Sequence, residues 1–364
     1  MTHGKKKRII VKIGTGVLTS GVGQLDTVKM GAICKQVSEA KRLGYQVALV
    51  SSGAVGLGMG KLGLKVRPRQ ISAVQKCAAV GQGILIQTWG ELFAPYGITV
   101  AQILLTRDDV DDRARFKAMR TLMNELLDDG IVPIINENDC ISAAELNIKF
   151  GDNDVLSSLV AALARADALV ILSTAKGLID MKGTGRIVPL VEKITPAIRQ
   201  MAEGTTSSTA VGGMITKIKA AEIATNSGCD VFIADGTNAH SLSDIISGGN
   251  PGTKFAARSD IGTSRKRWLA HFGRSIGKII VDEGAAKALC ERGSSLLHAG
   301  VKDVLGRFSK GNLVEIADSL NNEVFARGLA EIDSDSLKKI IAEKPKNKCG
   351  HKDVVVHRDN LALV

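Results

Sequence analysis

The chain has 364 residues, a length that favours two domains over one, and 45% hydrophobic residues are enough for a sizeable core. The formal net charge of +11 fits nucleic acid or small anionic substrates as partners, but 3% aromatic residues leave little to stack on bases. No apolar run approaches the roughly 18 residues that span a bilayer, and Lys12 breaks the stretch behind the basic start, which argues against a signal peptide. We therefore expect a cytoplasmic protein with no membrane partner.

Up to about residue 260, short apolar runs alternate with longer amphipathic stretches. The runs predict strands at residues 9–13, 46–50, 99–105, 132–135, 168–172 and 230–234, and the stretches predict helices that include 26–43, 113–127, 155–166 and 214–226. The runs are continuously apolar rather than alternating, which indicates strands covered on both faces. We therefore predict an α/β fold, a three-layer αβα sandwich around a mostly parallel sheet.

The pattern changes after Pro251-Gly252-Thr253. From about residue 276 the predicted strands are shorter and separated by Gly and Asp turns, with one or two short helices such as 335–342. This predicts a small β-rich module. We expect a first domain at residues 1–260, a linker at 261–275 and a second domain at 276–364.

Small and polar residues follow each predicted strand of the first domain. They read Gly-Thr-Gly, Ser-Ser-Gly, Thr-Arg-Asp, Asn-Glu-Asn-Asp, Ser-Thr and Asp-Gly. The carboxyl ends of strands in an open parallel sheet form the ligand crevice, so we expect the chemistry at this edge.

The first strand ends in Lys12, and Gly14 and Gly16 follow it. Glycines let a backbone approach a ligand closely, so their N–H groups can cradle phosphate oxygens while Lys12 supplies a charge. A surface lysine beside an ordinary turn is the alternative. Ser52 and Gly53 follow the second strand and offer a hydroxyl and N–H groups at the same edge.

A G-x-G-x-x-G pattern at Gly58, Gly60 and Gly63 raises a dinucleotide-binding alternative. It begins eight residues beyond the predicted strand, and no Asp or Glu that could bind a ribose lies between Glu39 and Glu91. We therefore interpret these glycines as helix or loop packing.

Two further polar segments stand at Asn136 to Asp139 and at Asp152-Asn153-Asp154. One Asp can cap the following helix, and the excess indicates recognition of an ammonium group, a positioned cation, or both. Mg²⁺ carried by nucleotide phosphates would suffice, so no metal held by protein side chains is predicted. The six scattered cysteines likewise show no zinc or disulfide pattern.

Gly212 and Gly213 precede a predicted helix whose first turn holds Thr216 and Lys217. Glycine N–H groups, a hydroxyl and an ammonium group at a helix N-terminus form an anion site. No Walker A sequence is present, so this is not a P-loop.

Histidine is absent from all of these segments, because His3 lies in the tail and the other five fall at His240 or later. A carboxylate acceptor needs no histidine base, since a glutamate side chain with a pKa of about 4.3 is ionised at neutral pH. Phosphoryl transfer to a carboxylate needs positioning and charge neutralisation, which two lysines, glycine N–H groups and an aspartate would supply.

These segments belong to stretches that resemble the amino acid kinase superfamily through nearly the whole chain. The stretches are VKIGTGVL, SSGAVGLG, GILIQTWGELFAPYGITVAQILLTRDD, IVPIINENDCI, FGDNDVLSSLVAALARAD and GGMITKIKAAEIA. The tail, with RKRW, VDEGAAKAL, RGSSLL and VVVHRDNL, resembles a PUA module. The resemblance implies the amino acid kinase fold followed by a small PUA-like barrel. It also implies ATP-dependent phosphorylation of the side-chain carboxylate of L-glutamate to L-glutamyl 5-phosphate, the first step of proline biosynthesis.

The resemblance assigns roles residue by residue. Lys12 would stabilise charge on the transferring phosphoryl group, Lys217 would hold the nucleotide phosphates, and Asp154 would orient both lysines. Gly14 and Gly53 would offer backbone N–H groups to the phosphates. The residues implied for glutamate are Ser52, Gly53, Asn136, Asp139, Asp152 and Asn153. Those implied for the nucleotide are Lys12, Gly14, Thr15, Ser173, Thr174, Val211, Gly212, Gly213, Met214, Ile215, Thr216 and Lys217.

The implied partners are ATP as co-substrate, Mg²⁺ on its phosphates, proline as a feedback inhibitor, and further copies of the chain in a dimer or tetramer. Four positions depart from the family pattern. Gly16 replaces a serine, Ser173-Thr174-Ala175 replaces Thr-Asp, IDMKGTGR lacks the usual Asp-Pro-Arg, and Val211 replaces a threonine. All but the first fall where the base and ribose are expected, so they bear on ATP affinity and not on phosphoryl transfer.

Two alternatives remain. The PUA-like tail and the basic charge allow an RNA-binding or RNA-modifying protein, although residues 264–364 carry only 18 Lys+Arg against 13 Asp+Glu. A kinase for acetylglutamate or UMP shares the first glycine loop but typically lacks the tail.

Overall fold

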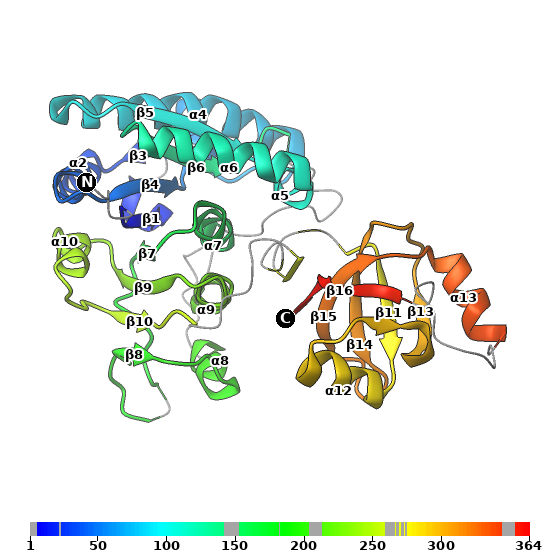
Figure 1. Cartoon of the computed structure of the whole chain (residues 1–364). Helices are drawn as coiled ribbons and strands as arrows, with labels where there is room; N and C mark the ends of the chain where they lie inside the picture. The colour runs from blue at the N-terminus through cyan, green and yellow to red at the C-terminus, as the bar shows by residue number, and fades with distance from the viewer. Residues whose placement is uncertain are drawn as a thin grey trace. The chain divides into compact units, whose positions relative to one another are not determined.

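The computed structural model describes residues 6–21, 23–141, 153–181, 183–203, 213–258, 266, 269–270, 273, 275–343 and 354–364. The chain divides into two compact units, Met1–Asp260 and Ile261–Val364 (Figure 1). Each unit has a sheet and a hydrophobic core of its own.

The first unit is built on an eight-stranded sheet in the order β5-β6-β4-β1-β7-β9-β10-β8. Its strands are β1 (Arg8–Ile13), β4 (Gln46–Ser51), β5 (Val100–Leu105), β6 (Val132–Glu137), β7 (Ala168–Ser173), β8 (Leu190–Val191), β9 (Asp230–Asp235) and β10 (Thr253–Phe255). Neighbouring strands run parallel except for β10, which is antiparallel to β9. A separate pair, β2 (Thr19–Gly21) and β3 (Gln24–Leu25), follows β1.

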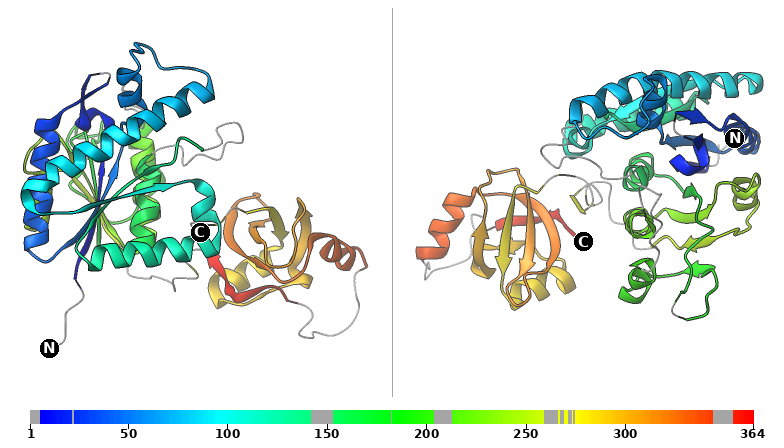
Figure 2. Two further views of the ribbon diagram at one scale, coloured as in Figure 1. Left: turned by 90° about the horizontal axis from the view of Figure 1, so that it is seen from above. Right: turned by 180° about the vertical axis from the view of Figure 1, so that it is seen from behind.

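Helices cover both faces of this sheet, which confirms the predicted three-layer αβα sandwich (Figures 1 and 2). One face carries α2 (Thr27–Arg42), α4 (Ile71–Phe93) and α10 (Ser241–Ile246), and the other carries α6 (Arg113–Asp128), α7 (Asn153–Ala164) and α9 (Met214–Asn226). The remaining helices of the unit are α1 (Thr15–Leu18), α3 (Ala54–Lys61), the 3₁₀ turn η1 (Ala94–Tyr96), α5 (Arg107–Asp111) and α8 (Pro196–Glu203).

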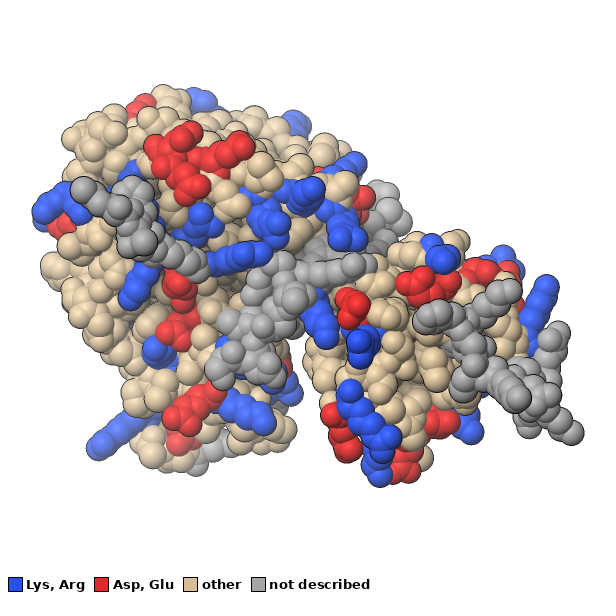
Figure 3. All heavy atoms as spheres, viewed as in Figure 1, with Lys and Arg blue, Asp and Glu red and all other residues tan. Residues whose placement is uncertain are grey.

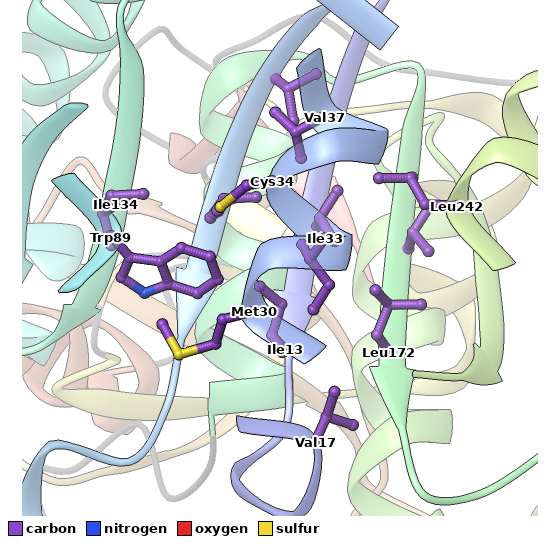
Figure 4. Close-up of a cluster of buried hydrophobic side chains, with 14 of the residues drawn as sticks. Ile13, Val17, Met30, Ile33, Cys34, Val37, Trp89, Ile134, Leu172 and Leu242 are labelled. Carbon is purple, nitrogen blue, oxygen red and sulfur yellow. The ribbon is translucent and has the colours of Figure 1, made fainter. Parts of the chain in front are cut away.

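The core of the first unit lies between the sheet and the layer that contains α2 and α4 (Figure 4). Trp89 of α4 and Met30 and Ile33 of α2 pack there against Ile13 of β1 and Leu172 of β7. These side chains are buried, and apolar burial of this kind contributes about 25 cal/mol per Å² removed from water. The central strand is therefore fixed in position by its apolar side chains.

Strand β1 divides its side chains between the two faces of the sheet. Ile9, Val11 and Ile13 belong to the cluster just described, and successive side chains of a strand point to opposite faces. Ile10 and Lys12 therefore face the layer in which α7 packs on β1, and Lys12 is only 4% exposed. A lysine thus occupies a buried position at the end of the central strand.

The predicted strands and helices of the first domain agree with the structure to within two residues at each end. Helix α4, by contrast, was not predicted. The glycines of the G-x-G-x-x-G pattern serve packing: a Cβ on Gly58 of α3 would lie 1.8 Å from Cys77 O of α4, and one on Gly60 would lie 2.2 Å from Gly23 Cα. Close packing of this kind accounts for Gly58 and Gly60.

The second unit is a curled six-stranded sheet in the order β12-β16-β15-β14-β11-β13, which confirms the β-rich module (Figure 1). Its strands are β11 (Gly277–Val281), β12 (Leu296–Leu297), β13 (Val301–Leu305), β14 (Leu313–Asp318), β15 (Val324–Ala330) and β16 (Val354–Leu363). All pairs are antiparallel except β11 with β14. Its helices with described bounds are α12 (Glu283–Arg292), the 3₁₀ turn η3 (His298–Gly300) and α13 (Ser334–Glu343).

Part of the segment expected as a linker belongs to the second unit. Arg327 of β15 donates hydrogen bonds to Ala270 O at 3.1 Å and Gly273 O at 2.6 Å, and its Nη2 also lies 2.7 Å from Ser275 Oγ. The guanidinium group presents several donors in a fixed plane, so one side chain can hold three points of a passing chain. The described residues between 270 and 275 are therefore attached to β15.

No helix in the described part of the chain combines the length and the apolar character needed to cross a membrane. Five cysteines fall in the described ranges, and all of them are free thiols: Cys34, Cys77, Cys140, Cys229 and Cys290. Within those ranges no group of three or more His, Cys, Asp or Glu side chains is arranged to hold a metal ion.

Candidate active site

The carboxyl ends of β1, β4, β6 and β7 lie at one edge of the sheet. The parallel registers set Ile13 beside Ser51 on one side and beside Leu172 on the other, so the loops that follow these strands leave from a common edge. Helices α7 and α9 begin at this same edge and pack against each other. The expected crevice therefore brings strand ends and two helix N-termini together.

Three charged side chains meet below this edge. Lys12 Nζ lies 2.6 Å from Asp154 Oδ1, and Lys217 Nζ lies 3.1 Å from Asp154 Oδ2. Lys12 and Lys217 are 4% and 5% exposed, and Asp154 is fully buried. The three come from β1, from the first turn of α7 and from the first turn of α9, so the carboxylate stands between two ammonium groups.

Opposing effects act on the Asp154 carboxyl group. Burial by itself raises the pKa, because the charged form loses its hydration, but the charges of Lys12 and Lys217 and their hydrogen bonds hold the pKa of Asp154 below its ordinary value. The carboxyl group is therefore ionised at neutral pH. With both lysines charged, the three side chains sum to a formal charge of +1, an arrangement that attracts an anion.

The first loop corrects one expectation. The N–H of Gly14 donates to Leu172 O at 2.9 Å, which extends the pairing of β1 with β7, so this group does not serve a phosphate. The next two N–H groups, those of Thr15 and Gly16 in the first turn of α1, have no acceptor among the residues that the structure describes. Gly14 does keep the loop close to the cluster, since a Cβ there would lie 3.7 Å from Lys12 Nζ.

Three of the residues expected to hold glutamate form one hydrogen-bonded group. Asn153 Nδ2 donates to Ser52 Oγ at 2.9 Å and to Asn136 Oδ1 at 3.0 Å. The three residues come from the start of α7, the loop after β4 and the strand β6. Gly53 follows Ser52 with a φ of 102°, a left-handed conformation that favours glycine, and begins α3.

The other residues expected at glutamate are less completely placed. Asp139 lies half-buried in the turn that follows β6, and Asp152 falls outside the described residues. Burial and the charge of Asp139 raise the pKa of the neighbouring Cys140 thiol.

The nucleotide candidates lie at the ends of β7 and α9. Ser173 Oγ accepts the Ala175 N–H at 3.1 Å and so shapes the turn after β7, while Thr174 is exposed above it. At the start of α9, Gly213 and Ile215 are exposed and Met214 is buried. Thr216 Oγ1 lies 2.9 Å from Asp154 Oδ2. Val211 and Gly212 lie outside the described residues.

Two supporting residues were not predicted from the sequence. The indole N–H of buried Trp89 donates to Ser51 Oγ at 3.0 Å, directly before Ser52, and Gln82 Nε2 lies 3.4 Å from Glu137 O, directly after Asn136. Both come from α4, a helix that the sequence analysis did not predict. A tryptophan and a glutamine seven residues apart share one face of a helix, and this spacing was the available signal.

The fold and the site together define a class of protein. A buried pair of ammonium groups is held by a carboxylate at the carboxyl edge of a parallel sheet, with hydroxyl and amide groups beside it. Such a site can neutralise a migrating phosphoryl group without any histidine base. These features are those of a phosphotransferase.

Comparisons with known proteins agree. The sequence profile described as "Amino acid kinase family" matches residues 7–235, and that of the PUA domain matches residues 277–348. The glutamate 5-kinase of Moorella thermoacetica is 41% identical over 98% of this chain and 96% of its own length, and that of Geobacter sulfurreducens is 42% identical over 99% and 98%. The chain therefore belongs to the amino acid kinase family and, within it, to the glutamate 5-kinases.

A solved structure shares the fold at low sequence identity. The carbamate kinase from Giardia lamblia bound to AMP-PNP superposes with a TM-score of 0.50 at 18% identity, covering 70% of this chain and 99% of that one. This similarity concerns the fold alone.

Proposed function

We infer that the protein phosphorylates the side-chain carboxylate of L-glutamate with ATP, giving L-glutamyl 5-phosphate and ADP. The glutamate 5-kinases align with it over nearly the full chain. The observation that carries the mechanism is the contact of Asp154 with both Lys12 and Lys217.

The reaction needs one bond to form and one to break. A carboxylate oxygen of glutamate attacks the γ-phosphorus, and the bond from that phosphorus to the bridging oxygen of ADP breaks, so ADP leaves with the electron pair. The acceptor is already ionised at neutral pH, because a glutamate side chain has a pKa of about 4.3. The protein therefore supplies position and positive charge.

We assign the roles as follows. Lys12 stabilises charge on the moving phosphoryl group, Lys217 holds the nucleotide phosphates, and Asp154 fixes both ammonium groups. Ser52, Asn153 and Asp139 hold glutamate. Further glutamate candidates are Gly53, Asn136 and Asp152, and further nucleotide candidates are Thr15, Ser173, Thr174, Val211, Gly212, Gly213, Met214 and Ile215.

Mg²⁺ enters this scheme on the phosphates of ATP. The ion prefers oxygen ligands and keeps several waters, so it needs few protein ligands when phosphates supply the rest. When bound, it would neutralise part of the negative charge of the phosphates, and Lys12 and Lys217 would neutralise more of it.

Trapping the product tests the function directly. The protein is incubated with ATP, Mg²⁺, glutamate and hydroxylamine, and the hydroxamate formed from the acyl phosphate is measured. Folded protein that yields none would contradict the proposal. Adding acetylglutamate or UMP as a competitor in the same assay separates glutamate from the acceptors of related kinases.

Regulation and assembly are proposed on the family resemblance. Proline is expected to compete with glutamate, which a rise in the apparent KM for glutamate on adding proline would reveal. We also propose a dimer or tetramer, which sedimentation would show, and domains at 1–260 and 276–364. The two compact units support the boundary at residue 260 and place the segment expected as a linker in the second unit.

RNA binding through the second unit is a second candidate, favoured by the PUA match at residues 277–348. On the face shown in Figure 3, Lys and Arg side chains are interspersed with Asp and Glu side chains. RNA binding would weaken steeply with added salt, since it would depend on phosphate contacts. A titration of the full chain with RNA at two salt concentrations tests it.

A further inference from the structure

The hydroxyl group of Thr216 contacts a carboxylate, which binding a nucleotide phosphate would not require. Its Oγ1 lies 2.9 Å from Asp154 Oδ2 and also 2.9 Å from Gly213 O. A threonine hydroxyl has one proton, and both neighbours are acceptors, so it donates to one of them at a time. A hydrogen bond to a carboxylate is roughly twice as strong as one between neutral groups, which favours Asp154 as the acceptor.

The carboxylate of Asp154 is contacted from several sides. Oδ1 meets Lys12 of β1, and Oδ2 meets both Lys217 and Thr216 of α9. Among the residues that the structure describes, Lys12 and Lys217 are charged groups that face it, and each comes from an element packed against α7. Rotation of the carboxylate would change its contacts with both lysines together, so the group that fixes its rotation also sets their positions.

We propose that Thr216 is a positioning residue, whose hydroxyl fixes the carboxylate of Asp154 so that Lys12 and Lys217 are both held toward the transferring phosphoryl group. The inference rests on the proposed kinase function. It gives Thr216 an action through Asp154, whereas the family resemblance placed it among the groups that bind the nucleotide.

Three variants test the proposal. Thr216→Val keeps the branched shape and removes the hydroxyl, and Thr216→Ser keeps the hydroxyl. Thr225→Val is the matched control, because Thr225 lies in the same helix, is buried, and donates its hydroxyl to Glu222 O three residues earlier, as Thr216 can to Gly213 O. It is remote in sequence from the first turn of α9.

Three quantities are measured for each variant: kcat, the KM for ATP, and the affinity for ADP, which is obtained by calorimetry. Thr216→Val is expected to lower kcat by about 10- to 100-fold, the equivalent of one hydrogen bond to a charged group. ADP affinity should fall much less than kcat, because Lys217 keeps its own contact with Asp154. Thr216→Ser should restore most of kcat, and Thr225→Val should match the wild type. Weakened ADP binding with an unchanged kcat would mean that the hydroxyl contacts the phosphates, and the proposal would be wrong.

A second readout does not depend on turnover. Because the pKa of Asp154 is depressed in the fold, its ionised form adds stability that is present at neutral pH and is lost as the pH falls through the folded pKa. A hydrogen bond to a charged carboxylate favours its ionised form, so we expect removal of the Thr216 hydroxyl to raise that pKa toward the ordinary value. Thr216→Val should therefore lose less stability than the wild type between pH 7 and acid pH in urea unfolding.

The kinetic and the unfolding measurements test the role of Thr216 separately from the proposed kinase function. If the wild type forms no hydroxamate, the kinase proposal fails, and the acid unfolding of Thr216→Val still decides whether the hydroxyl acts on Asp154. If that unfolding follows the wild type and Thr225→Val at every pH, Thr216 does not position the carboxylate.

Discussion

Lys12, Asp154 and Lys217 form a buried cluster in which two ammonium groups face one carboxylate. Water reaches this cluster poorly, so its excess positive charge is less well screened than it would be at the surface. A bound phosphate group would compensate that charge. Because the buried cluster carries an excess of positive charge, removing the carboxylate and removing one ammonium group should change the stability of the fold by different amounts.

Two variants distinguish the contributions at this scale. Asp154→Asn leaves two buried ammonium groups without a carboxylate, and it is expected to destabilise the fold by about 3–5 kcal/mol, the cost of removing one partner of a buried pair. Lys12→Met leaves Asp154 paired with Lys217, so its cost should be clearly smaller. Urea unfolding of both variants measures the order, and a larger loss in Lys12→Met would contradict this account.

Lys12→Met should nevertheless lose activity. Removing a group that stabilises developing charge lowers kcat by about 10²- to 10³-fold in comparable sites. The hydroxamate assay, run where the variant is shown by circular dichroism to be folded, measures this. Turnover at the wild-type rate would show that Lys12 does not meet the phosphoryl group.

At the scale of elements, the crossing of α3 and α4 supports the loops that hold Ser52 and Gly53. A Cβ on Gly81 of α4 would lie 1.7 Å from Ala54 O, the first residue of α3, so the two backbones are in direct contact there. Trp89 of the same helix hydrogen-bonds Ser51. Helix α4 therefore supports the loop that carries two of the residues proposed to hold glutamate.

Gly81→Ala and Gly83→Ala are a matched pair that tests this contact. Gly81→Ala is expected to destabilise the protein by about 1–3 kcal/mol or more through overpacking and to raise the KM for glutamate. Gly83 is exposed and has nothing within 4 Å of a built Cβ, so Gly83→Ala should stabilise by up to about 1 kcal/mol through helix propensity. Melting temperatures and the two KM values check both, and equal effects would refute the role of the crossing.

Helix α4 is the longest of the elements that the sequence analysis did not predict. Three glycines, Gly81, Gly83 and Gly90, lower its helix propensity, and Gln70 before it provides no side-chain cap. The surroundings of two of these glycines differ. The backbone of α3 leaves no room for a Cβ on Gly81, whereas a Cβ on Gly83 would have no atom within 4 Å. Tertiary packing stabilises a helix here that local propensity does not favour.

At the scale of the whole molecule, the candidate residues all belong to the first unit. They run from Lys12 to Lys217, and each unit has its own hydrophobic cluster. The second unit is held together by its own sheet, with Arg327 bound to Ala270, Gly273 and Ser275. Catalysis and the PUA domain are therefore expected to be separable.

Deleting residues 261–364 is the test of that separation. The shortened chain is expected to fold, because its core is complete, and to form the hydroxamate with a kcat close to that of the full chain. Its melting curve and its turnover are measured together. A folded piece without turnover would mean that the second unit contributes to the reaction.

The sequence by itself determined the layered α/β fold, the β-rich second unit and most of the strand-end residues at the site. Continuously apolar runs can be buried only between two layers, and parallel strands carry the residues that follow them to a common edge. Only the tertiary structure decided which groups are in contact. The Gly14 N–H was expected to meet phosphate and pairs with β7 instead, and Thr216 reaches Asp154 across 62 residues. The local sequence pattern determines which side chains lie at the carboxyl edge of the sheet. Their hydrogen-bond partners depend on how α7, α9 and β1 pack together.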